Sequence, residues 1–308
     1  MTGQRQLIID GYHAELAYEN RCLILVQPGQ PSRRLPLSRI TKIICLHSVS
    51  LSTQLLGQLQ ANRIDFVHLN QRYPANSFCL QGGSNLPSTE RRLQQYAWCL
   101  DPQISRAVVL QLRKRKLRHS MRHVYEPALL EQLKLNLRNL YGASTIASMR
   151  GIEGASQRLM YQTMRQKLPT NLGFTQRRYH PAPDPVNAAL SLTFSLVYQE
   201  AIRTLISVGL DPTLGFLHVP NNRRFALACD LMEVARPYVE AWVCQAFMAG
   251  TFTTAHFSRK TDLCLFKKAG REIFYPAMYA EFPQWQRLMR SLASLLRAQL
   301  SVGINSRP

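Results

Sequence analysis

Two acidic residues, Asp230 and Glu233, interrupt a stretch of the chain that is otherwise apolar and has helical periodicity. A spacing of three residues places both carboxylates on one face of a helix. Two carboxylates on a largely buried face repel one another unless a proton, a base or a cation lies between them. A divalent cation is the simplest solution; the alternatives are solvated acids or ion pairs with Arg223, Arg224 or Arg236.

A third carboxylate and an imidazole elsewhere in the chain are candidates to complete such a site. Glu153 lies between Gly151 and Gly154. Each glycine costs a helix about 1 kcal/mol relative to alanine, so the pair indicates that a ligand or another backbone comes close. His218 ends the segment GLDPTLGFLH (209–218). One neutral imidazole with two or three carboxylates suits Mg²⁺ or Mn²⁺ in phosphodiester chemistry; a helix-start carboxylate and a structural histidine are the alternatives.

Two tyrosines are further candidates for chemistry on DNA. Tyr179 directly follows Arg177 and Arg178, and Tyr198 lies within a predicted helix. A tyrosine can attack phosphate as a nucleophile or position a DNA end. The alternative for both is core packing with a hydrogen-bonded hydroxyl.

Positive charge is concentrated in the run RKRKLR (113–118), which belongs to a predicted helix and contains no acid. Arg106, Arg113, Lys114 and Lys116 fall at spacings that give a charged stripe. We interpret the stripe as a phosphate-binding surface, with a solvated helix face as the alternative. The other candidates for DNA contact flank the remaining motifs and are Arg150, Arg177, Arg178, Arg223 and Arg224.

These motifs follow one another in a characteristic order. They are RGIEGA (150–155), DPVN (184–187), the helix through Tyr198, GLDPTLGFLH (209–218) and DLMEVARP (230–237). In this order they resemble the CRISPR-associated adaptation integrase family, whose members insert spacers. The joint pattern spans most of the centre of the helical region.

The resemblance implies a set of site residues and partners. Metal ligands are implied at Glu153, His218 and Glu233, with Asp230 beside them. Because family members hold Asp or Glu at the last two positions, which of the two binds the ion directly stays open. The tyrosines resemble those near the family's active site. The implied partners are double-stranded DNA (a prespacer and the CRISPR repeat), a second copy in a homodimer, and a small second Cas adaptation subunit in a heterohexamer.

The elements that must position these groups divide the chain in two. Short β-branched or alternating runs predict a mostly antiparallel β-domain over 1–80, with one helix at 52–61. A Gly- and Ser-containing segment at 81–89 is typical of a linker. The remainder, 90–308, is predicted to be a larger all-α catalytic domain, which makes the fold class α+β. Its expected helices cover 90–99, 103–122, 126–140, 144–168, 185–208, 224–247 and 282–300.

Charge and composition narrow the class of partner. The chain has 308 residues, 38 Lys and Arg against 18 Asp and Glu, and a net charge of +20. Residues 86–308 carry 30 of those basic groups and 14 of the acidic ones, so a polyanion is expected to bind there. An anionic membrane surface is the competing interpretation, although no run reaches the roughly 18 apolar residues of a spanning helix.

Cysteine usage and the first residues indicate the compartment. Seven cysteines are scattered without a CxxC pair, which argues against a disulfide scaffold and a zinc ribbon. The first ten residues lack the apolar stretch of a signal peptide. We therefore expect a cytoplasmic protein.

Three other functions are compatible with these residues. A transposon-encoded integrase would keep the same site and act on its own element ends. A tyrosine recombinase would use Tyr198 or Tyr179 covalently and would leave a trapped protein–DNA adduct. A non-enzymatic basic protein would bind DNA without any need for a metal ion.

Overall fold

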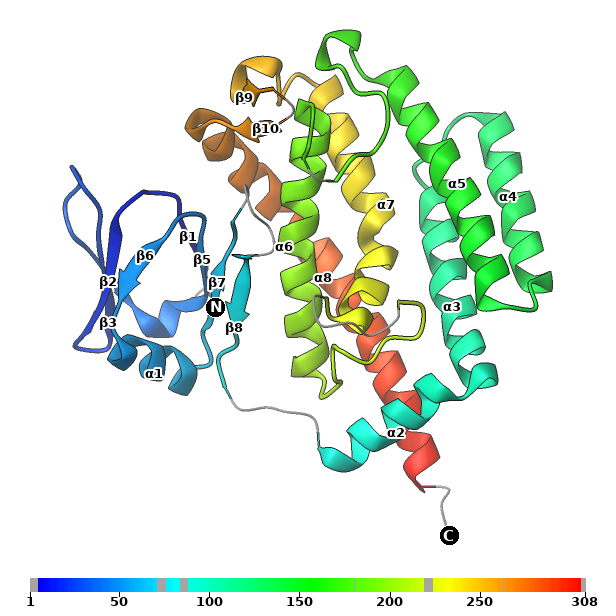
Figure 1. Cartoon of the computed structure of the whole chain (residues 1–308), viewed down its shortest axis with the longest axis horizontal. Coiled ribbons are helices and arrows are strands. Elements are labelled where there is room, and N and C mark those ends of the chain that lie inside the picture. The colour runs from blue at the N-terminus through cyan, green and yellow to red at the C-terminus, as the bar shows by residue number, and fades with distance from the viewer. Residues whose placement is uncertain are drawn as a thin grey trace. The chain divides into compact units, whose positions relative to one another are not determined.

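The computed structural model of the chain is shown in Figure 1 and describes residues 5–70, 76–83, 88–179, 181–218, 224–261 and 263–305. It divides into two compact units, Met1–Asn85 and Leu86–Pro308. Strands fill the first unit and helices dominate the second, which confirms the predicted α+β class. Part of the expected linker, residues 84–87, lies outside the described residues.

The first unit contains two four-stranded sheets, with strand orders β1-β5-β7-β8 and β4-β3-β2-β6. The strands are β1 (Arg5–Ile9), β2 (Ala14–Glu19), β3 (Cys22–Val26), β4 (Arg33–Pro36), β5 (Ile40–Cys45), β6 (Val49–Leu51), β7 (Asp65–His68) and β8 (Phe78–Leu80). One helix, α1 (Thr53–Ala61), connects β6 to β7.

Strand pairing in these sheets differs from the prediction. The pairs β1–β5, β5–β7 and β2–β6 are parallel, whereas β2–β3, β3–β4 and β7–β8 are antiparallel. The expectation of a mostly antiparallel domain is therefore wrong. The reason is that other elements lie between the two strands of each parallel pair and return the chain in its original direction: β2 to β4 between β1 and β5, β3 to β5 between β2 and β6, and α1 between β5 and β7.

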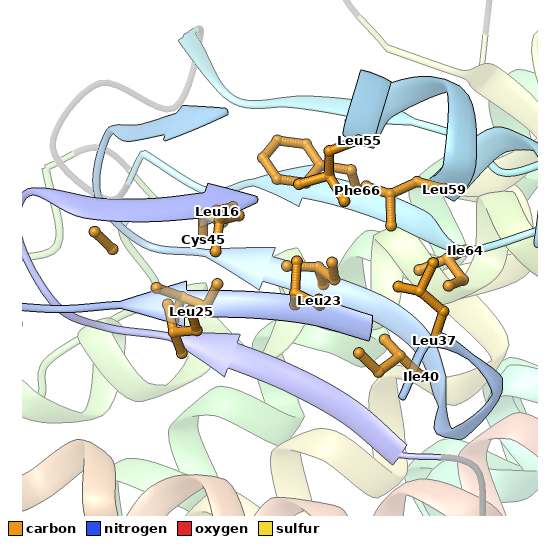
Figure 2. Close-up of a cluster of buried hydrophobic side chains, with 13 residues drawn as sticks. Leu16, Leu23, Leu25, Leu37, Ile40, Cys45, Leu55, Leu59, Ile64 and Phe66 are labelled. Carbon is orange, nitrogen blue, oxygen red and sulfur yellow. The ribbon is translucent and has the colours of Figure 1, made fainter. Parts of the chain in front are cut away.

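The core of the first unit joins both sheets and the helix (Figure 2). Leu16, Leu23 and Leu25 come from one sheet, and Phe66 comes from the other. Leu55 of α1 is fully buried against them. Alternation along each strand therefore buries one face, and hydrophobic burial of this set stabilises the unit.

The second unit is a helical assembly with one small hairpin. Its helices are α2 (Thr89–Leu100), α3 (Pro102–Met121), α4 (Pro127–Gly142), α5 (Ile146–Lys167), α6 (Pro185–Ser207), α7 (Ala226–Met248) and α8 (Lys268–Asn305). Strands β9 (Phe257–Lys260) and β10 (Leu263–Phe266) pair antiparallel, so the prediction of an all-α domain is wrong at this hairpin. Helix α8 begins before the predicted residue 282 because it continues through Pro276 and Pro283.

Helix α3 packs against both α5 and α7, and α6 packs along α7. These contacts bring together side chains that lie more than a hundred residues apart in sequence. Asp184 caps α6 as predicted, accepting the backbone N–H of Asn187 at 2.8 Å ahead of Pro185 at the first helical position. None of the described helices combines the length and the apolar composition needed to cross a bilayer.

Candidate active site

Two of the predicted carboxylates meet at one buried cation. Glu153 on α5 and Glu233 on α7 both accept hydrogen bonds from the ammonium of Lys116 on α3, with 2.6 Å between Nζ and Oε2 of Glu233. The Lys116 residue is only 3% exposed. Three helices thus bring two acidic oxygens and one positive charge to a single point.

Two arginines surround the same pair of carboxylates. Arg236 lies one turn after Glu233 and donates to it at 2.7 and 3.1 Å, while Arg113 Nη1 lies 3.6 Å from both Glu153 and Glu233. Burial by itself would raise the pKa of Glu233, but Arg236, Lys116 and Arg113 hold it well below its usual value. Glu233 is therefore ionised, as a metal ligand or an ion-pair partner must be. The ion pair with Arg236 was one of the alternatives in the sequence.

The basic run on α3 does not form the expected solvent-facing stripe. Arg113 and Lys116 are buried, because α3 is covered by α5 and α7 and these two side chains face the carboxylates. Arg106 donates to the carbonyl of Ala143 at 2.6 and 3.1 Å. The Lys114 ammonium lies 4.3 Å from the ring centroid of Tyr141. The stripe is therefore wrong for Arg113 and Lys116, which neutralise acids inside the unit.

Asp230 has a different role from Glu233, although both lie on α7. Its Oδ2 accepts the backbone N–H of Phe216 and of Leu217 at 2.7 and 3.0 Å, and its Oδ1 accepts the N–H of His218 at 3.1 Å. Oδ1 also lies 2.6 Å from Nδ1 of His218. The Asp230 carboxylate is thus fully engaged in holding the loop and its imidazole.

This pairing orients the histidine. With Nδ1 of His218 bound to Asp230, the other ring nitrogen, Nε2, is left to face a ligand. The His218 side chain is 43% exposed, whereas that of Asp230 is completely buried. A carboxylate that fixes the tautomer and direction of a metal-binding histidine has this arrangement. In this structure Asp230 therefore contacts the imidazole and the backbone of its loop, and does not contact the Lys116 ammonium that Glu153 and Glu233 share.

The loop that carries His218 is also anchored at its beginning. Gln95 of α2 is fully buried; its amide nitrogen donates to the carbonyls of Asp211 and Leu214, and its oxygen accepts the N–H of Asp211. Further along, a Cβ on Gly215 would lie 2.7 Å from the backbone carbon of Ala226. Only glycine lets the loop pack this closely on the first turn of α7.

The donor set fits a divalent metal ion in chemical type. Among the described residues, no three His, Cys, Asp or Glu side chains lie close enough together to hold a metal ion. Two carboxylate oxygens nevertheless converge on one cation, the Lys116 ammonium, and His218 lines the same cavity. Two carboxylates and an imidazole form a hard to borderline site that suits Mg²⁺ or Mn²⁺.

Two cavities are lined by these groups. The larger, of about 570 Å³, is lined by Glu153, His218 and Glu233 together with basic and aromatic side chains that include Arg158 and Tyr179. The second, of about 540 Å³, shares Glu153 and His218 and adds Arg150 and Arg224. Glu153 and His218 therefore line both cavities, and Glu233 lines the larger one.

The two candidate tyrosines are placed differently. Tyr179 is 52% exposed and lines the larger cavity, with the Arg177 guanidinium 4.3 Å from its ring centroid. The hydroxyl of Tyr198 accepts the backbone N–H of Phe225 at 2.8 Å, and burial raises its pKa. Tyr179 is thus available to a ligand, whereas Tyr198 supports the first residues of α7.

The remaining predicted DNA contacts lie around the cavities. Arg150 donates to the carbonyl of Leu217 and Arg224 is exposed, and both line the second cavity. Arg177 donates to the side chains of Asn187 and Ser191 at the cavity wall. Arg178 is exposed beside it. Arg223 lies outside the described residues.

The sequence did not single out Glu240, or the two residues of the larger cavity that donate to it, Gln157 and Tyr161. Glu240 on α7 is buried and accepts from Tyr161 at 2.7 Å and from Gln157 at 2.9 Å. Burial and the nearby Glu240 raise the pKa of Tyr161 well above its usual value. The available signal was spacing alone: Glu240 follows Glu233 by seven residues, two turns of helix, on the face that Arg236 shares.

The fold and this site together define a class: an α+β protein in which a basic helical unit holds carboxylates and an oriented histidine suited to phosphodiester chemistry. A family model described as "CRISPR associated protein Cas1" matches residues 7–280. The chain belongs to this family, whose curated members include CRISPR-associated endonucleases. This confirms the resemblance found in the sequence.

Individual relatives agree with that assignment. The chain is 30% identical over 296 residues to CRISPR-associated endonuclease Cas1 1 of Thermodesulfovibrio yellowstonii, covering 91% of this chain and 92% of the relative. A solved Cas1 protein from Thermotoga maritima superposes with a TM-score of 0.85 at 17% identity, covering 96% of this chain and 97% of that one.

Two larger solved assemblies contain the same fold. A casposase bound to integration product matches with a TM-score of 0.82 at 18% identity, covering 96% of this chain and 91% of that one. A chain of a Cas6-RT-Cas1–Cas2 complex matches with a TM-score of 0.83 at 18% identity, covering 98% of this chain and 35% of that one. At such identities the likeness concerns the fold alone.

Proposed function

We propose that this protein is a divalent-metal-dependent DNA integrase and endonuclease of CRISPR adaptation. It joins the 3′-hydroxyl ends of a short duplex to the CRISPR repeat by transesterification. The observation that carries the proposal is that Glu153 and Glu233 meet at one cation position and line the same basic cavity as an imidazole that Asp230 orients. We place this activity in the cytoplasm.

The roles of the residues follow from their contacts. Glu153, Glu233 and His218 would hold the ion, and Asp230 fixes the direction of the imidazole. When bound, Mg²⁺ or Mn²⁺ supplies charge stabilisation at the phosphate under attack. The basic side chains of the two cavities bind the phosphates of the incoming and target strands without reading sequence.

The reaction needs no nucleophile from the protein. The 3′-oxygen of the incoming DNA forms a new bond to phosphorus while the bond from phosphorus to the 3′-oxygen of the repeat strand breaks, so the number of phosphodiesters is unchanged. The attacking hydroxyl loses a proton and the leaving oxygen gains one. With water as the nucleophile, the same site cleaves DNA. Tyr198 is unsuited to attack because its hydroxyl already accepts from Phe225 and its pKa is raised.

The proposed assembly extends beyond one chain. We propose that residues 1–80 form the homodimer and that 90–308 carry catalysis. Double-stranded DNA is the substrate, and a small second Cas subunit completes a heterohexamer. The likeness to a chain of a Cas6-RT-Cas1–Cas2 complex supports such a subunit, and the unpaired edges of the two sheets favour a partner for the first unit.

A transposon-encoded integrase is the second candidate. The likeness to a casposase bound to integration product favours it, because the same fold there is found with joined DNA. The two functions share one chemistry and differ in the target. A supercoiled plasmid with a CRISPR repeat, compared with one that lacks the repeat, distinguishes them by where the labelled duplex is joined.

A strand-transfer assay tests the chemistry itself. Labelled duplex with ordinary 3′ ends should join in the presence of Mg²⁺ or Mn²⁺, and duplex with 3′-dideoxy ends should not. Tyr198→Phe and Tyr179→Phe should both keep measurable joining. Joining of the dideoxy duplex, or a covalent protein–DNA adduct lost in a tyrosine variant, would overturn the proposal in favour of a recombinase. DNA binding without any metal-dependent joining would indicate a non-enzymatic protein.

A further inference from the structure

The negative charges of Glu153 and Glu233 are already neutralised by side chains without a metal ion. Lys116, Arg113 and Arg236 all lie within 3.6 Å of one or both carboxylates. Glu240, 3.6 Å from Arg236, is the next acid. A divalent ion placed among these groups would add two further positive charges within a few ångströms of three cations. Such crowding in a buried site is strongly unfavourable.

One of the three cations, Lys116, lies where a metal ion would bind and has a side chain that can move away. The Lys116 ammonium lies between the two carboxylates, which is the position that a shared metal ion would take. Arg236 is instead fixed by three hydrogen bonds to Glu233, and Arg113 is held farther off at 3.6 Å. Lysine is a compact charge on a flexible four-carbon stem. The cavity of about 570 Å³ that Lys116 lines gives the stem room to move.

We infer that Lys116 is an internal counter-ion that occupies the metal position in the metal-free protein and is displaced when the divalent ion binds. The lysine therefore sets the affinity of the site, since every binding event must break its ion pairs with Glu153 and Glu233. This role differs from both metal ligation and DNA contact. It rests on the proposed metal site, and the experiments below distinguish its failure from the failure of that site.

The first experiment measures Mn²⁺ binding to the purified full-length chain by calorimetry. Lys116→Met removes the charge and keeps the length of the side chain. It should bind Mn²⁺ more tightly than the wild type by about tenfold or more, because a unit charge a few ångströms away is removed. Lys116→Arg keeps the charge and should stay close to wild-type affinity. Lys134→Met, at an exposed residue paired with Glu131, is the matched control and should change nothing.

Equal or weaker Mn²⁺ binding by Lys116→Met would overturn the inference and leave the metal site in place. Absence of Mn²⁺ binding in both the wild type and Lys116→Met would overturn the metal site and the inference together. The melting temperature in EDTA adds a further readout. Lys116→Met should melt lower than the wild type without metal, because two carboxylates then lack their shared partner, and should gain more from added Mn²⁺.

The second experiment uses the wild-type chain and so does not depend on a variant that folds. An amine-reactive acylating reagent modifies accessible lysines, and mass spectrometry reads the extent at each. Lys116 is 3% exposed and should be protected in EDTA, then become several-fold more reactive with Mn²⁺, while Lys134 is unchanged. Unchanged or stronger protection of Lys116 with Mn²⁺ would overturn the displacement.

Discussion

Asp230 and Glu233 lie one turn apart on α7, yet their carboxylates are held in different ways. Asp230 belongs to what we call the imidazole side, where backbone N–H groups and His218 satisfy both of its oxygens. Glu233 belongs to the cation side, where Lys116, Arg113 and Arg236 surround it and Glu153. Backbone hydrogen bonds fix a geometry, whereas ion pairs can exchange one cation for another. The comparison teaches that backbone hydrogen bonds hold one half of the site and ion pairs between side chains hold the other.

The largest expected effect is on the cation side. Glu153→Gln or Glu233→Gln should each reduce strand transfer at least about 100-fold, because each removes a charge proposed to bind the ion and stabilise the transition state. The strand-transfer assay with Mn²⁺ measures this loss. DNA affinity in a gel-shift assay should stay near the wild-type value, since neither residue binds phosphate. Full joining by either variant would remove that residue from the proposed ligands.

A substitution on the imidazole side should reduce strand transfer less than one on the cation side and should destabilise the fold more. Asp230→Asn should weaken Mn²⁺ binding by about 10- to 100-fold, because the histidine loses the group that orients it. It should also destabilise the chain by about 2–3 kcal/mol in urea unfolding, since three backbone N–H groups lose a charged acceptor. Asp211→Asn, at the other end of the same loop, is the matched control and should reduce stability only. Loss of all Mn²⁺ binding in Asp230→Asn would indicate that Asp230 is a direct ligand. It would then contradict the distinction between the imidazole side and the cation side.

Neutralising arginines that line the larger cavity should have a smaller effect, which is on DNA affinity. Arg158 and Arg165 are exposed on α5 and line the larger cavity. Replacing both with Gln should lower DNA affinity and reduce the slope of log affinity against log salt by about 2, at roughly 0.9 for each phosphate that is no longer neutralised. The exposed Arg287 and Arg290 of α8, both changed to Gln, serve as the control pair. An equal change in slope for both pairs would mean that net charge, not the cavity, binds the DNA.

The smallest expected effect on strand transfer is at Gln95, which holds the beginning of the loop that carries His218. Gln95→Leu should destabilise the chain by about 2–4 kcal/mol, because three buried backbone groups lose their partners. At temperatures below the unfolding midpoint of the variant, strand transfer should be only a few-fold lower than in the wild type, because Asp230 still holds His218. Gln94→Leu, the neighbouring position on α2, is the control and should unfold like the wild type. A loss of joining as large as that of Asp230→Asn would show that the loop is held from both ends equally.

The class of fold was predictable because its signals are local. Alternating short runs predicted most strands, helical periodicity predicted the helices, and Asp184 with Pro185 predicted where α6 begins. Strands β6 and β8 have three residues each, too few for an alternating pattern to be recognised. The parallel pairs depend on the path of the chain between the paired strands, and local periodicity does not encode that path.

The sequence singled out residues that the structure brings together, but it did not predict what each of them contacts. Motif order picked out Glu153, His218, Asp230 and Glu233. The spacing of Asp230 and Glu233 put both on one helix face, but what each carboxylate meets depends on which segments pack there. Lys116 lies in a basic run that predicts a phosphate-binding surface. The side chain is buried instead because α3 packs against both α5 and α7.

The close contact at Gly215 limits how this protein can evolve. A side chain there would meet the backbone carbon of Ala226 at 2.7 Å and the backbone nitrogen of Leu227 at 2.9 Å, so a smaller residue at position 226 brings no relief. Position 215 is therefore closed to substitution for as long as α7 keeps its first turn. Sequence drift in this loop is confined to its other positions, and an ancestor of this chain with the same helix start would already have carried the glycine.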